Sequence, residues 1–536
     1  MASSNPKRTV RLQFAVMFLV AVLAGWLASL LPANAVALAK YPDLAAAASP
    51  ERLLSLRQIA AVSVFALIIC ATLMFEERRL GVAFVGIAAL LGLKVLTLSE
   101  FVHSTELHII LLLVGMMTLV GALKDMGFFT WIIQSIINAK KMTGLKFVAI
   151  LMLLAGIMPG IVDEVTSIVF VLALVFQVCD TLKLRPTPFV LMSVMATNIG
   201  STGTMLGNPV GILIGTKAEY HWNPGSGDPG VPLSFGDFIV HATPIMFLSL
   251  LAVFLVLLVY YRKDIRLLDE RLAERRASHI GLGPMVAIPY RRGLAILLGS
   301  LAFIASHHPL EHALGLEPNT MLVAAPLAIA GLLMIFRSHR ARHYVENSIE
   351  WWSLLFFMML FAVSFALEHC GVTDVIAEEI APDGAAPSKF LLTPLIVAIT
   401  AVGSAFVDNI VFVSTFIPII KKIVATAPEM SPLWWALLFG ACFGGNITAI
   451  GSTANLVAIS MLGKKYSIKV AFLEWLKVGL IVGVVSCAVA TGVVLTYYKQ
   501  PVCKAPAEAP AAEVAASVAP SAEPAASAEP SAEIAE

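Results

Sequence analysis

The chain has few charged residues. Only 13% of its 536 residues are Asp, Glu, Lys or Arg, against about a quarter in soluble domains, while 59% are hydrophobic and the mean hydropathy is +0.87. Uncharged runs of about 20 residues, the length that crosses a bilayer core of roughly 30 Å, recur along the sequence. This composition excludes a soluble globular fold and predicts an all-α polytopic membrane protein. A formal net charge of +1 gives no reason to expect a nucleic-acid partner.

Several catalytic and metal-binding patterns are missing. The six cysteines lack CxxC spacing, which argues against a zinc site or a disulfide framework. There is no Walker A pattern for ATP, and no Gly-x-Gly precedes Asp163 or Asp408, as it would in an intramembrane aspartyl protease. His307, His308 and His312 lie at an expected span end, where histidine is common. We therefore expect a transporter and not an enzyme, with no metal site and no cofactor beyond Na⁺ or H⁺ as coupling ion.

Eleven spans and two interrupted segments are expected. The interrupted segments, 145–182 and 390–424, carry proline and acidic residues at their centres, which favours re-entrant hairpins over straight spans. Residues 128–138 and 372–381 are expected to form short interfacial helices. The expected spans are 12–31, 58–75, 80–98, 107–123, 188–216, 238–261, 293–307, 320–336, 351–368, 432–462 and 476–498.

Basic residues lie mostly on one side of these spans. With a cytoplasmic N-terminus, 26 of the 36 lysines and arginines fall on the cytoplasmic side, as the positive-inside rule requires. This predicts a multi-pass inner-membrane protein whose C-terminal tail is periplasmic. Ala33-Asn34-Ala35 is typical of signal-peptidase sites, but the apolar run before it is longer than most signal segments, so we expect the first span to be retained.

An internal repeat relates two halves of the chain. A shift of 244 residues places Gly127 on Gly371, and a shift of 245 places Asp163 on Asp408. Because each repeat holds five spans plus a hairpin, the second copy is inverted, and such transporters bind substrate near mid-membrane where the repeats meet. The expected domains are an N-terminal span and linker 1–57, a first repeat 58–261, a basic cytoplasmic loop 262–292, a second repeat 293–498, and a disordered Ala/Pro/Glu-rich tail 499–536.

Polar residues in the hairpins and in two glycine-rich spans form the candidate site. A carboxylate at membrane depth costs about 2.5–3.5 kcal/mol on insertion scales, so acids in the hairpin tips call for a function. Capping of a half-helix is the alternative explanation, and it is compatible with binding. The segments 198–209 and 444–455 are expected to be unwound, which is tolerated in a membrane only around a cavity or inside protein; close helix packing also explains their glycines. The candidate substrate- or ion-binding residues are Asp163, Glu164, Thr166, Asn198, Thr202, Asn208, Asp408, Asn409, Asn446, Ser452, Thr453 and Asn455.

These motifs resemble those of the ion transporter superfamily, which groups arsenite permeases, NhaD-type sodium/proton antiporters, and citrate and dicarboxylate permeases. The resemblance covers roughly residues 58–498 and is carried by the paired hairpins and unwound spans. Asp408-Asn409 is similar to the hairpin tip of the arsenite and antiporter branch. Glu164 and Asn208 depart from it, since Asn and Asp are usual there. The resemblance implies an elevator movement of hairpins and unwound spans against a scaffold.

Two classes of substrate stay open. The segments 147–182, 186–216, 390–420 and 432–463 contain no Lys or Arg, and neighbouring carboxylates suit competition between H⁺ and a metal cation. Antiport of Na⁺ against H⁺ is the favoured interpretation. The alternative is a proton- or sodium-coupled permease for arsenite, citrate or another small anion. Besides this small ion and the lipid bilayer, a second copy of the chain in a homodimer is a compatible partner.

The charge bias predicts the side on which two loops lie. In a chain whose native cysteines are replaced, Ser278→Cys in the basic loop should be protected from a membrane-impermeant thiol reagent added to intact cells. Ser226→Cys, in the segment 217–237, should react. Labelling of Ser278→Cys with protection of Ser226→Cys would reverse the expected orientation.

Overall fold

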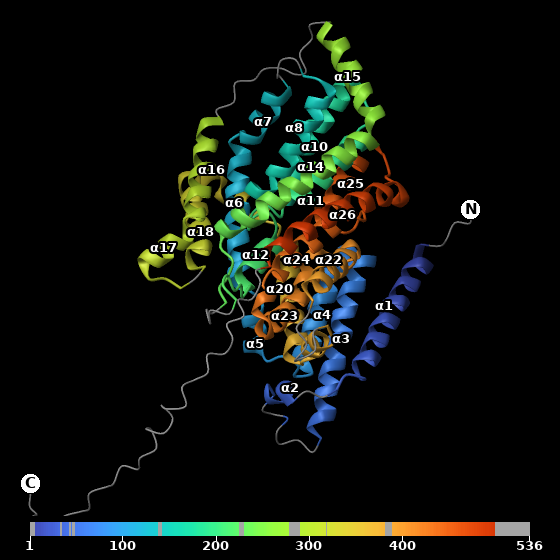
Figure 1. The fold of residues 1–536 in the computed structure, drawn as a ribbon, viewed down its shortest axis with the longest axis vertical. Helices are drawn as coiled ribbons and strands as arrows, with labels where there is room; N and C mark the ends of the chain where they lie inside the picture. Colours follow the sequence, from blue (N-terminus) through green and yellow to red (C-terminus); the bar gives the residue numbers. More distant parts are fainter. Residues whose placement is uncertain are drawn as a thin grey trace, which may run out of the picture. The chain divides into compact units, whose positions relative to one another are not determined.

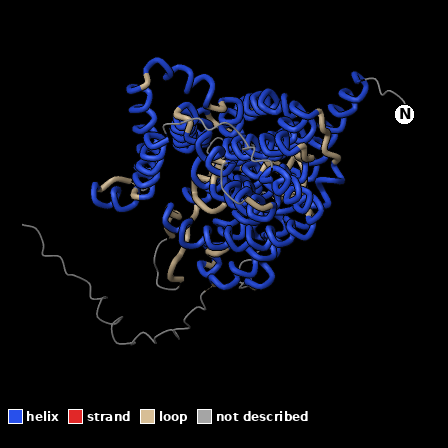
Figure 2. The backbone as a smooth tube through the Cα atoms, turned by 90° about the horizontal axis from the view of Figure 1, so that it is seen from above, coloured by secondary structure: helices blue, strands red, loops and turns tan. Residues whose placement is uncertain are grey.

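The computed structural model describes residues 6–32, 35–41, 44, 49–137, 142–224, 230–277, 290–317, 319–380 and 388–498 (Figure 1). Regular structure in these ranges is helical, apart from one isolated antiparallel bridge between Tyr220 and Val231 (Figure 2). The expected disordered tail and residues 278–289 of the expected basic loop lie outside the described residues, as do Ser226 and Ser278.

The first half of the chain contains α1 (Pro6–Ala28), α2 (Ala35–Ala39), α3 (Pro50–Met74), α4 (Arg79–Gly92), α5 (Leu98–Ser104), α6 (Leu107–Asp125), α7 (Phe128–Ile137), α8 (Gly144–Ile157), α9 (Pro159–Val162), α10 (Glu164–Leu182), α11 (Thr187–Gly200), α12 (Pro209–Lys217), α13 (Phe235–Asp237), α14 (Thr243–Tyr260) and α15 (Arg262–Ala277). The second half contains α16 (Tyr290–Ala305), α17 (His307–Leu314), α18 (Thr320–Phe336), α19 (Ser338–His343), α20 (Trp351–His369), α21 (Val372–Ile380), α22 (Lys389–Phe406), α23 (Asn409–Thr426), α24 (Leu433–Gly444), α25 (Thr453–Tyr466) and α26 (Phe472–Val494).

The described residues include nine helical segments long and apolar enough to cross a membrane, or ten if α16 and α17, bent by 54°, form one span. This confirms the all-α polytopic membrane fold. Some expected spans are shorter apolar helices, among them α4, α11 and α18. The expected basic loop 262–292 begins with the charged helix α15.

The arms of the two expected hairpins are helices that meet at Asp163 and Asp408. Each arm counts 18 or 19 residues. At 1.5 Å per residue such a helix is about 28 Å long, close to the thickness of a bilayer core. Length therefore does not distinguish a spanning arm from a re-entrant one, and re-entrance stays a prediction.

The helices recur at the shift found in the sequence. α6 and α20 begin and end 244 residues apart, and each is followed by a glycine with positive φ, 73° at Gly127 and 75° at Gly371. Packing recurs as well, because α6 lies against α18 as α20 lies against α4, and α10 against α25 as α23 lies against α12. The two halves therefore share one arrangement of helices. Inversion of the second half across the membrane stays a prediction.

Two glycines allow the broken spans to touch the hairpins. A Cβ on Gly200, the last residue of α11, would lie 1.9 Å from the carbonyl oxygen of Gly156 in α8. A Cβ on Gly444, the last residue of α24, would lie 2.4 Å from the Cα of Ala401 in α22. Since the obstructing atoms belong to backbone, no rotamer change relieves either contact. Close packing of small residues explains both glycines.

We expect Gly200→Ala and Gly444→Ala each to lower the apparent Tm of the detergent-purified protein, because overpacking a core by a methyl group costs about 1–3 kcal/mol. Gly299→Ala and Gly492→Ala are matched controls, since a Cβ at either position meets nothing within 4 Å. A wild-type Tm for Gly200→Ala would contradict the close approach of α11 and α8.

Candidate functional site

Each hairpin turns at an aspartate that caps its second arm. Asp163 caps α10: its Oδ1 accepts from the backbone N–H of Thr166 at 2.8 Å and its Oδ2 accepts from the Thr166 hydroxyl at 2.7 Å. Asp408 caps α23 by accepting from the N–H of Ile410 at 3.1 Å. The φ of Asp163 is 129°, a strained value outside glycine, whereas that of Asp408 is −48°. Both carboxylates lie at helix N-termini, where the positive end of the helix dipole stabilises them.

The two broken spans present two further helix N-termini. Non-helical segments separate α11 from α12 and α24 from α25, so the unwinding expected from the sequence is observed. Asn208 caps α12, accepting from the N–H of Gly211 at 2.8 Å, and Ser452 caps α25, accepting from the N–H of Ala454 at 3.2 Å. The two caps are 244 residues apart, as the repeat requires.

Asn198, near the end of α11, joins the two broken spans. Its Nδ2 donates to the Oδ1 atoms of Asn446 and Asn455, both at 2.9 Å. Its Oδ1 accepts from the Ser452 hydroxyl at 3.1 Å. Asn455 in turn donates to two carbonyl oxygens of the unwound segment, at 2.8 and 2.9 Å. All four side chains are buried. The network therefore satisfies carbonyl groups that left the helix when the span unwound.

One contact between the halves is made twice with different side chains. Nδ2 of Asn208 donates to Sγ of Cys442 at 3.3 Å, and the Ser452 hydroxyl donates to Oδ1 of Asn198 at 3.1 Å. Asn208 corresponds to Ser452, and Asn198 to Cys442, at the shift of 244. The site is therefore symmetric in the placement of its side chains and asymmetric in their chemistry.

Glu164 lies where the two hairpins and the two broken spans meet. This first residue of α10 is only 6% exposed and faces Asp408 of the other hairpin and the hydroxyls of Ser201 and Ser452. Ser201 also accepts from Nδ2 of Asn208 at 2.7 Å. The N-termini of α10, α12, α23 and α25 thereby converge around one buried carboxylate.

A buried arginine reaches the site from outside the expected segments. Arg79, the first residue of α4, is 5% exposed, and its Nη1 lies 3.8 Å from Oδ2 of Asp408. Its guanidinium carbon stacks 4.7 Å from the ring centre of Phe356 in α20. The sequence interpretation counted Arg79 with Arg78 among the loop residues, so the site is not free of cations as the four lysine- and arginine-free segments indicated. The sequence feature that could have indicated burial of Arg79 is its position directly before an apolar run.

The remaining candidates lie at the same tips and breaks. The Thr202 hydroxyl donates to the carbonyl oxygen of Ile199 at 2.8 Å, Asn409 is buried at the start of α23, and Thr453 is half-buried at the start of α25. The structure thus gathers the twelve candidates in one region, and their binding of substrate or ion stays a prediction. In the part of the chain that the structure describes, no group of three or more His, Cys, Asp or Glu side chains could hold a metal ion.

The chain is similar to known membrane transporters. Residues 65–440 match the family model described as citrate transporter, CitMHS. An uncharacterized transporter of Mycobacterium tuberculosis is 32% identical over 450 residues, which cover 81% of this chain and 96% of that protein. The P protein of Homo sapiens is 25% identical over 496 residues, which cover 78% of this chain and 57% of that protein. The crystal structure of the Alcanivorax borkumensis YdaH transporter aligns with a TM-score of 0.48 and 15% identity, covering 83% of this chain and 98% of that one.

Arg79 and Asp408 should depend on each other for stability. Removing one partner of a buried ion pair leaves an uncompensated charge and destabilises by roughly 3–5 kcal/mol. Arg79→Met and Asp408→Asn should therefore each lower the apparent Tm, and the double variant should regain much of the loss. Melting curves of the four proteins measure this, with Arg78→Met at an exposed position as control. Losses that simply add in the double variant would show that the two groups are not coupled.

Proposed function

Because this chain belongs to the citrate transporter family and is a membrane transporter, we propose that it moves a small carboxylate such as citrate together with a coupling cation, H⁺ or Na⁺. The substrate class is taken from the family. The coupling is argued from the charges at the hairpin tips.

The charge balance of the site is the observation that carries this proposal. When ionised, Asp163, Glu164, Asp408 and the neighbouring Glu350 contribute four negative charges, and Arg79 contributes one positive charge. The four converging helix N-termini, each equivalent to about +0.5 charge, add about +2. The site without ligand therefore carries about one net negative charge. A multiply charged carboxylate enters such a buried site only with cations that neutralise it, and the carboxylate, amide and hydroxyl oxygens are hard ligands suited to H⁺ or Na⁺.

The helix caps offer a way to link cation and anion binding. The N–H of Thr166 at the start of α10 is engaged by Asp163, and the N–H of Ile410 at the start of α23 is engaged by Asp408, so these two groups are not free to bind a substrate anion. A proton or Na⁺ on the aspartate weakens its hold on these N–H groups. The helix N-terminus then becomes available to a substrate carboxylate. In this scheme the cation binds first and prepares the anion site.

We further propose that transport uses an elevator movement. In support, the hairpins and broken spans pack on one another, α8 on α11, α22 on α24 and α10 on α25, while α6 packs on α18 and α4 on α20. Location in the inner membrane, with a cytoplasmic N-terminus and a periplasmic tail, rests on the bias of basic residues. We also propose a homodimer. Apolar side chains such as Ile335 and Phe336, which are 72% and 82% exposed, offer a surface that a second copy of the chain can cover in place of lipid.

Antiport of Na⁺ against H⁺ is the second candidate. The observation that favours it is the crowding of Glu164 against Asp163 and Asp408, with a single arginine nearby. Carboxylates that interact this closely lose their protons in separate steps, which suits exchange of H⁺ for a metal cation. Within the anion class, arsenite or another small anion is the alternative to citrate.

Glu164→Gln distinguishes these candidates in proteoliposomes. If a carboxylate is carried with a cation, the variant should still take up citrate, but about tenfold more Na⁺ or H⁺ should be needed for half-maximal uptake, since one charged ligand is lost. The affinity for citrate at saturating cation should be unchanged. Glu474→Gln, which removes a half-exposed partner of Arg185, is the matched control.

Two results would contradict the carboxylate proposal. One is wild-type protein that moves protons in response to Na⁺ but takes up no citrate, arsenite or other small anion. The other is Glu164→Gln protein with enhanced citrate uptake and unchanged cation dependence, which would remove Glu164 from cation binding.

A further inference from the structure

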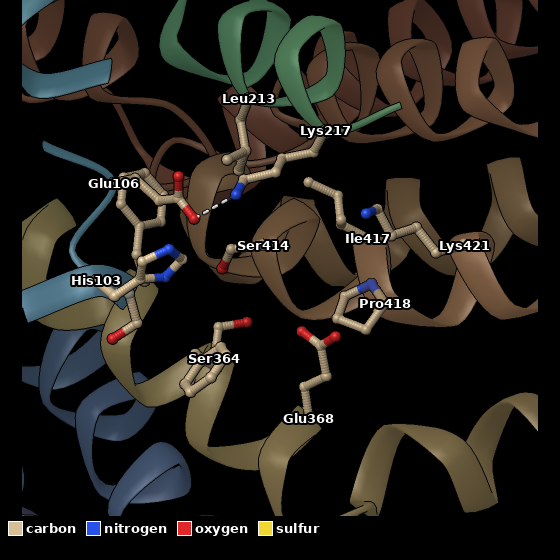
Figure 3. Close-up of a pocket in the computed structure, with 13 residues that line it drawn as sticks. His103, Glu106, Leu213, Lys217, Ser364, Glu368, Ser414, Ile417, Pro418 and Lys421 are labelled. Carbon is tan, nitrogen blue, oxygen red and sulfur yellow. Dashed lines mark ion pairs between the residues drawn. The ribbon is translucent and has the colours of Figure 1, made fainter. Parts of the chain in front are cut away.

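A pocket bearing two lysines lies among α5, α6, α12, α20 and α23 (Figure 3). The pocket has a volume of about 190 Å³. We call it the lysine pocket, defined by Glu106, Lys217, Ser364, Glu368, Ser414 and Lys421. Two of its helices, α12 and α23, begin at the central site with their caps Asn208 and Asp408, and contribute Lys217 and Lys421 near their other ends. The pocket and the central site are therefore joined by the same two helices.

An unsatisfied hydroxyl points to a ligand in the lysine pocket. Ser364 is 4% exposed, and its Oγ finds no hydrogen-bond partner among the described residues. Figure 3 shows this hydroxyl and the Glu368 carboxylate turned into the pocket, with the Ser414 hydroxyl opposite. Buried polar atoms are nearly always paired, so a group that is not part of the chain is expected to bond to Ser364.

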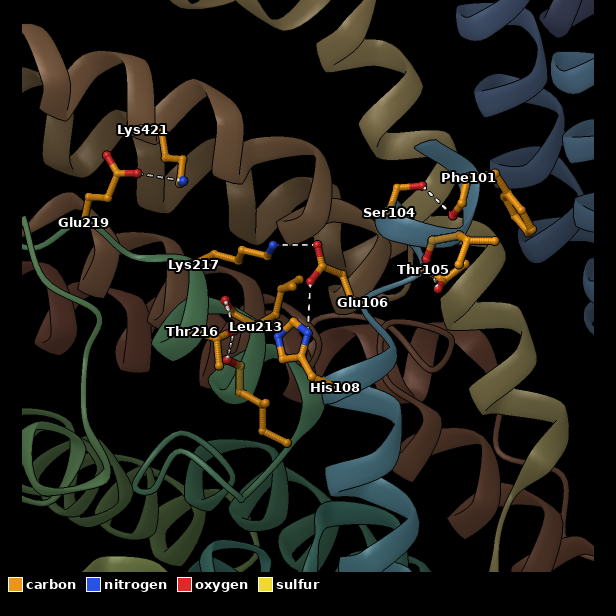
Figure 4. Close-up of polar contacts among 12 residues, drawn as sticks. Phe101, Ser104, Thr105, Glu106, His108, Leu213, Thr216, Lys217, Glu219 and Lys421 are labelled. Carbon is orange, nitrogen blue, oxygen red and sulfur yellow. Dashed lines mark hydrogen bonds and ion pairs between the residues drawn. The ribbon is translucent and has the colours of Figure 1, made fainter. Parts of the chain in front are cut away.

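Both lysines are held by glutamates from other segments (Figure 4). Nζ of Lys217 lies 2.6 Å from Oε1 of Glu106, and Nζ of Lys421 lies 2.8 Å from Oε1 of Glu219. The lysines are 31% and 35% exposed, and ion pairs at such exposure contribute little to stability. An incoming carboxylate can therefore replace either glutamate. The lining carries the two lysines together with Glu106 and Glu368, and Glu219 pairs with Lys421 from outside the lining, so a carboxylate binds here by replacing a glutamate and not by meeting an excess of positive charge.

The two lysines of the lysine pocket are not repeated at the corresponding positions of the other half of the chain. At the shift of 244 Lys217 corresponds to Met461, and at the shift of 245 Lys421 corresponds to Phe176. The other half carries its charges at different positions, because Glu368 corresponds to Lys124 and Nζ of Lys465 in α25 lies 5.1 Å from the ring centre of Phe176. A substrate carboxylate meets these two lysines from one side of the membrane only, which the bias of basic residues makes the periplasmic side.

We propose that the lysine pocket is an entry subsite for a carboxylate group of the substrate. In this subsite, substrate oxygens replace Glu106 as the partner of Lys217 and Glu219 as the partner of Lys421. The Ser364 hydroxyl donates a hydrogen bond to the same substrate carboxylate. This inference rests on the carboxylate transport proposed above and adds a second, one-sided binding site to it. The carboxylate then leaves the lysines for the capped N-termini of α12 and α23, the other ends of the helices that carry them.

Initial rates of citrate uptake in right-side-out and inside-out vesicles test the subsite. Lys217→Met, which introduces the residue found at the corresponding position 461, should raise the KM about tenfold from one side and leave the maximal rate and the KM from the other side unchanged. Glu106→Gln should lower the KM from the same side, because it removes the competitor for Lys217. An ion pair with a purely structural role would instead give losses in both variants. Lys422→Met is the control, since its ammonium bonds to the carbonyl oxygen of Asp374 at 3.2 Å and lies outside the pocket.

Several outcomes would overturn the subsite. They are an equal change of KM from both sides, no change in either variant, or a raised KM in Glu106→Gln. If Lys217→Met fails to reach the membrane, the direction in which Glu106→Gln changes the KM decides by itself whether the subsite exists. Wild-type protein that takes up no carboxylate from either side would refute the proposed function itself, and this failure is distinct from that of the subsite.

Discussion

Asn198 is the side chain on which the centre of this protein depends. Two spans are each broken into two half-helices, and the backbone groups released in the buried interior need partners within the chain. Asn198 bonds to the side chains of Asn446, Asn455 and Ser452, and Asn455 donates to two carbonyl oxygens of the unwound segment. Asn198 thereby joins the two halves of the chain and orients the side chain that satisfies the released carbonyls.

Convergent helix N-termini determine what the site can bind. Their partial positive charges stabilise the three carboxylates that lie close together, and among the described residues Arg79 forms an ion pair with one of them, Asp408. The caps Asp163 and Asp408 each accept a hydrogen bond from a backbone N–H group, so in this state those N–H groups have their partners within the chain. Binding must then displace internal contacts, and a cation that neutralises an aspartate is the simplest agent that does so. In the proposed function, hydrogen bonding in the caps would by itself couple the binding of the two ligands.

Much of this arrangement could be read from the sequence. Glycine- and Asn/Ser/Thr-rich segments predicted both breaks, and the shift of 245 residues paired the hairpin aspartates Asp163 and Asp408. Arg79 could not be assigned to the site from the sequence. It follows the charged residues Glu77 and Arg78, as loop residues commonly do, and its contact with Asp408 joins positions more than 300 residues apart. The same limit hid the amide network, because spacing along a chain does not say which asparagines meet. For the hairpin arms the structure adds no decision to the sequence, because a helix of 18 or 19 residues suits both a spanning and a re-entrant arm.

The departures from symmetry matter as much as the symmetry. A perfectly repeated site would treat the two sides of the membrane alike. Here the backbone and the hairpin aspartates Asp163 and Asp408 repeat, while three basic side chains do not: Arg79 corresponds to Val323, Lys217 to Met461, and Lys421 to Phe176. Packing of α10 on α25 recurs as packing of α23 on α12, and Lys217 and Lys421 lie on the second pair. In the elevator movement proposed above, the repeat would provide two conformations with similar packing, and the side chains that break the repeat would favour loading from one side.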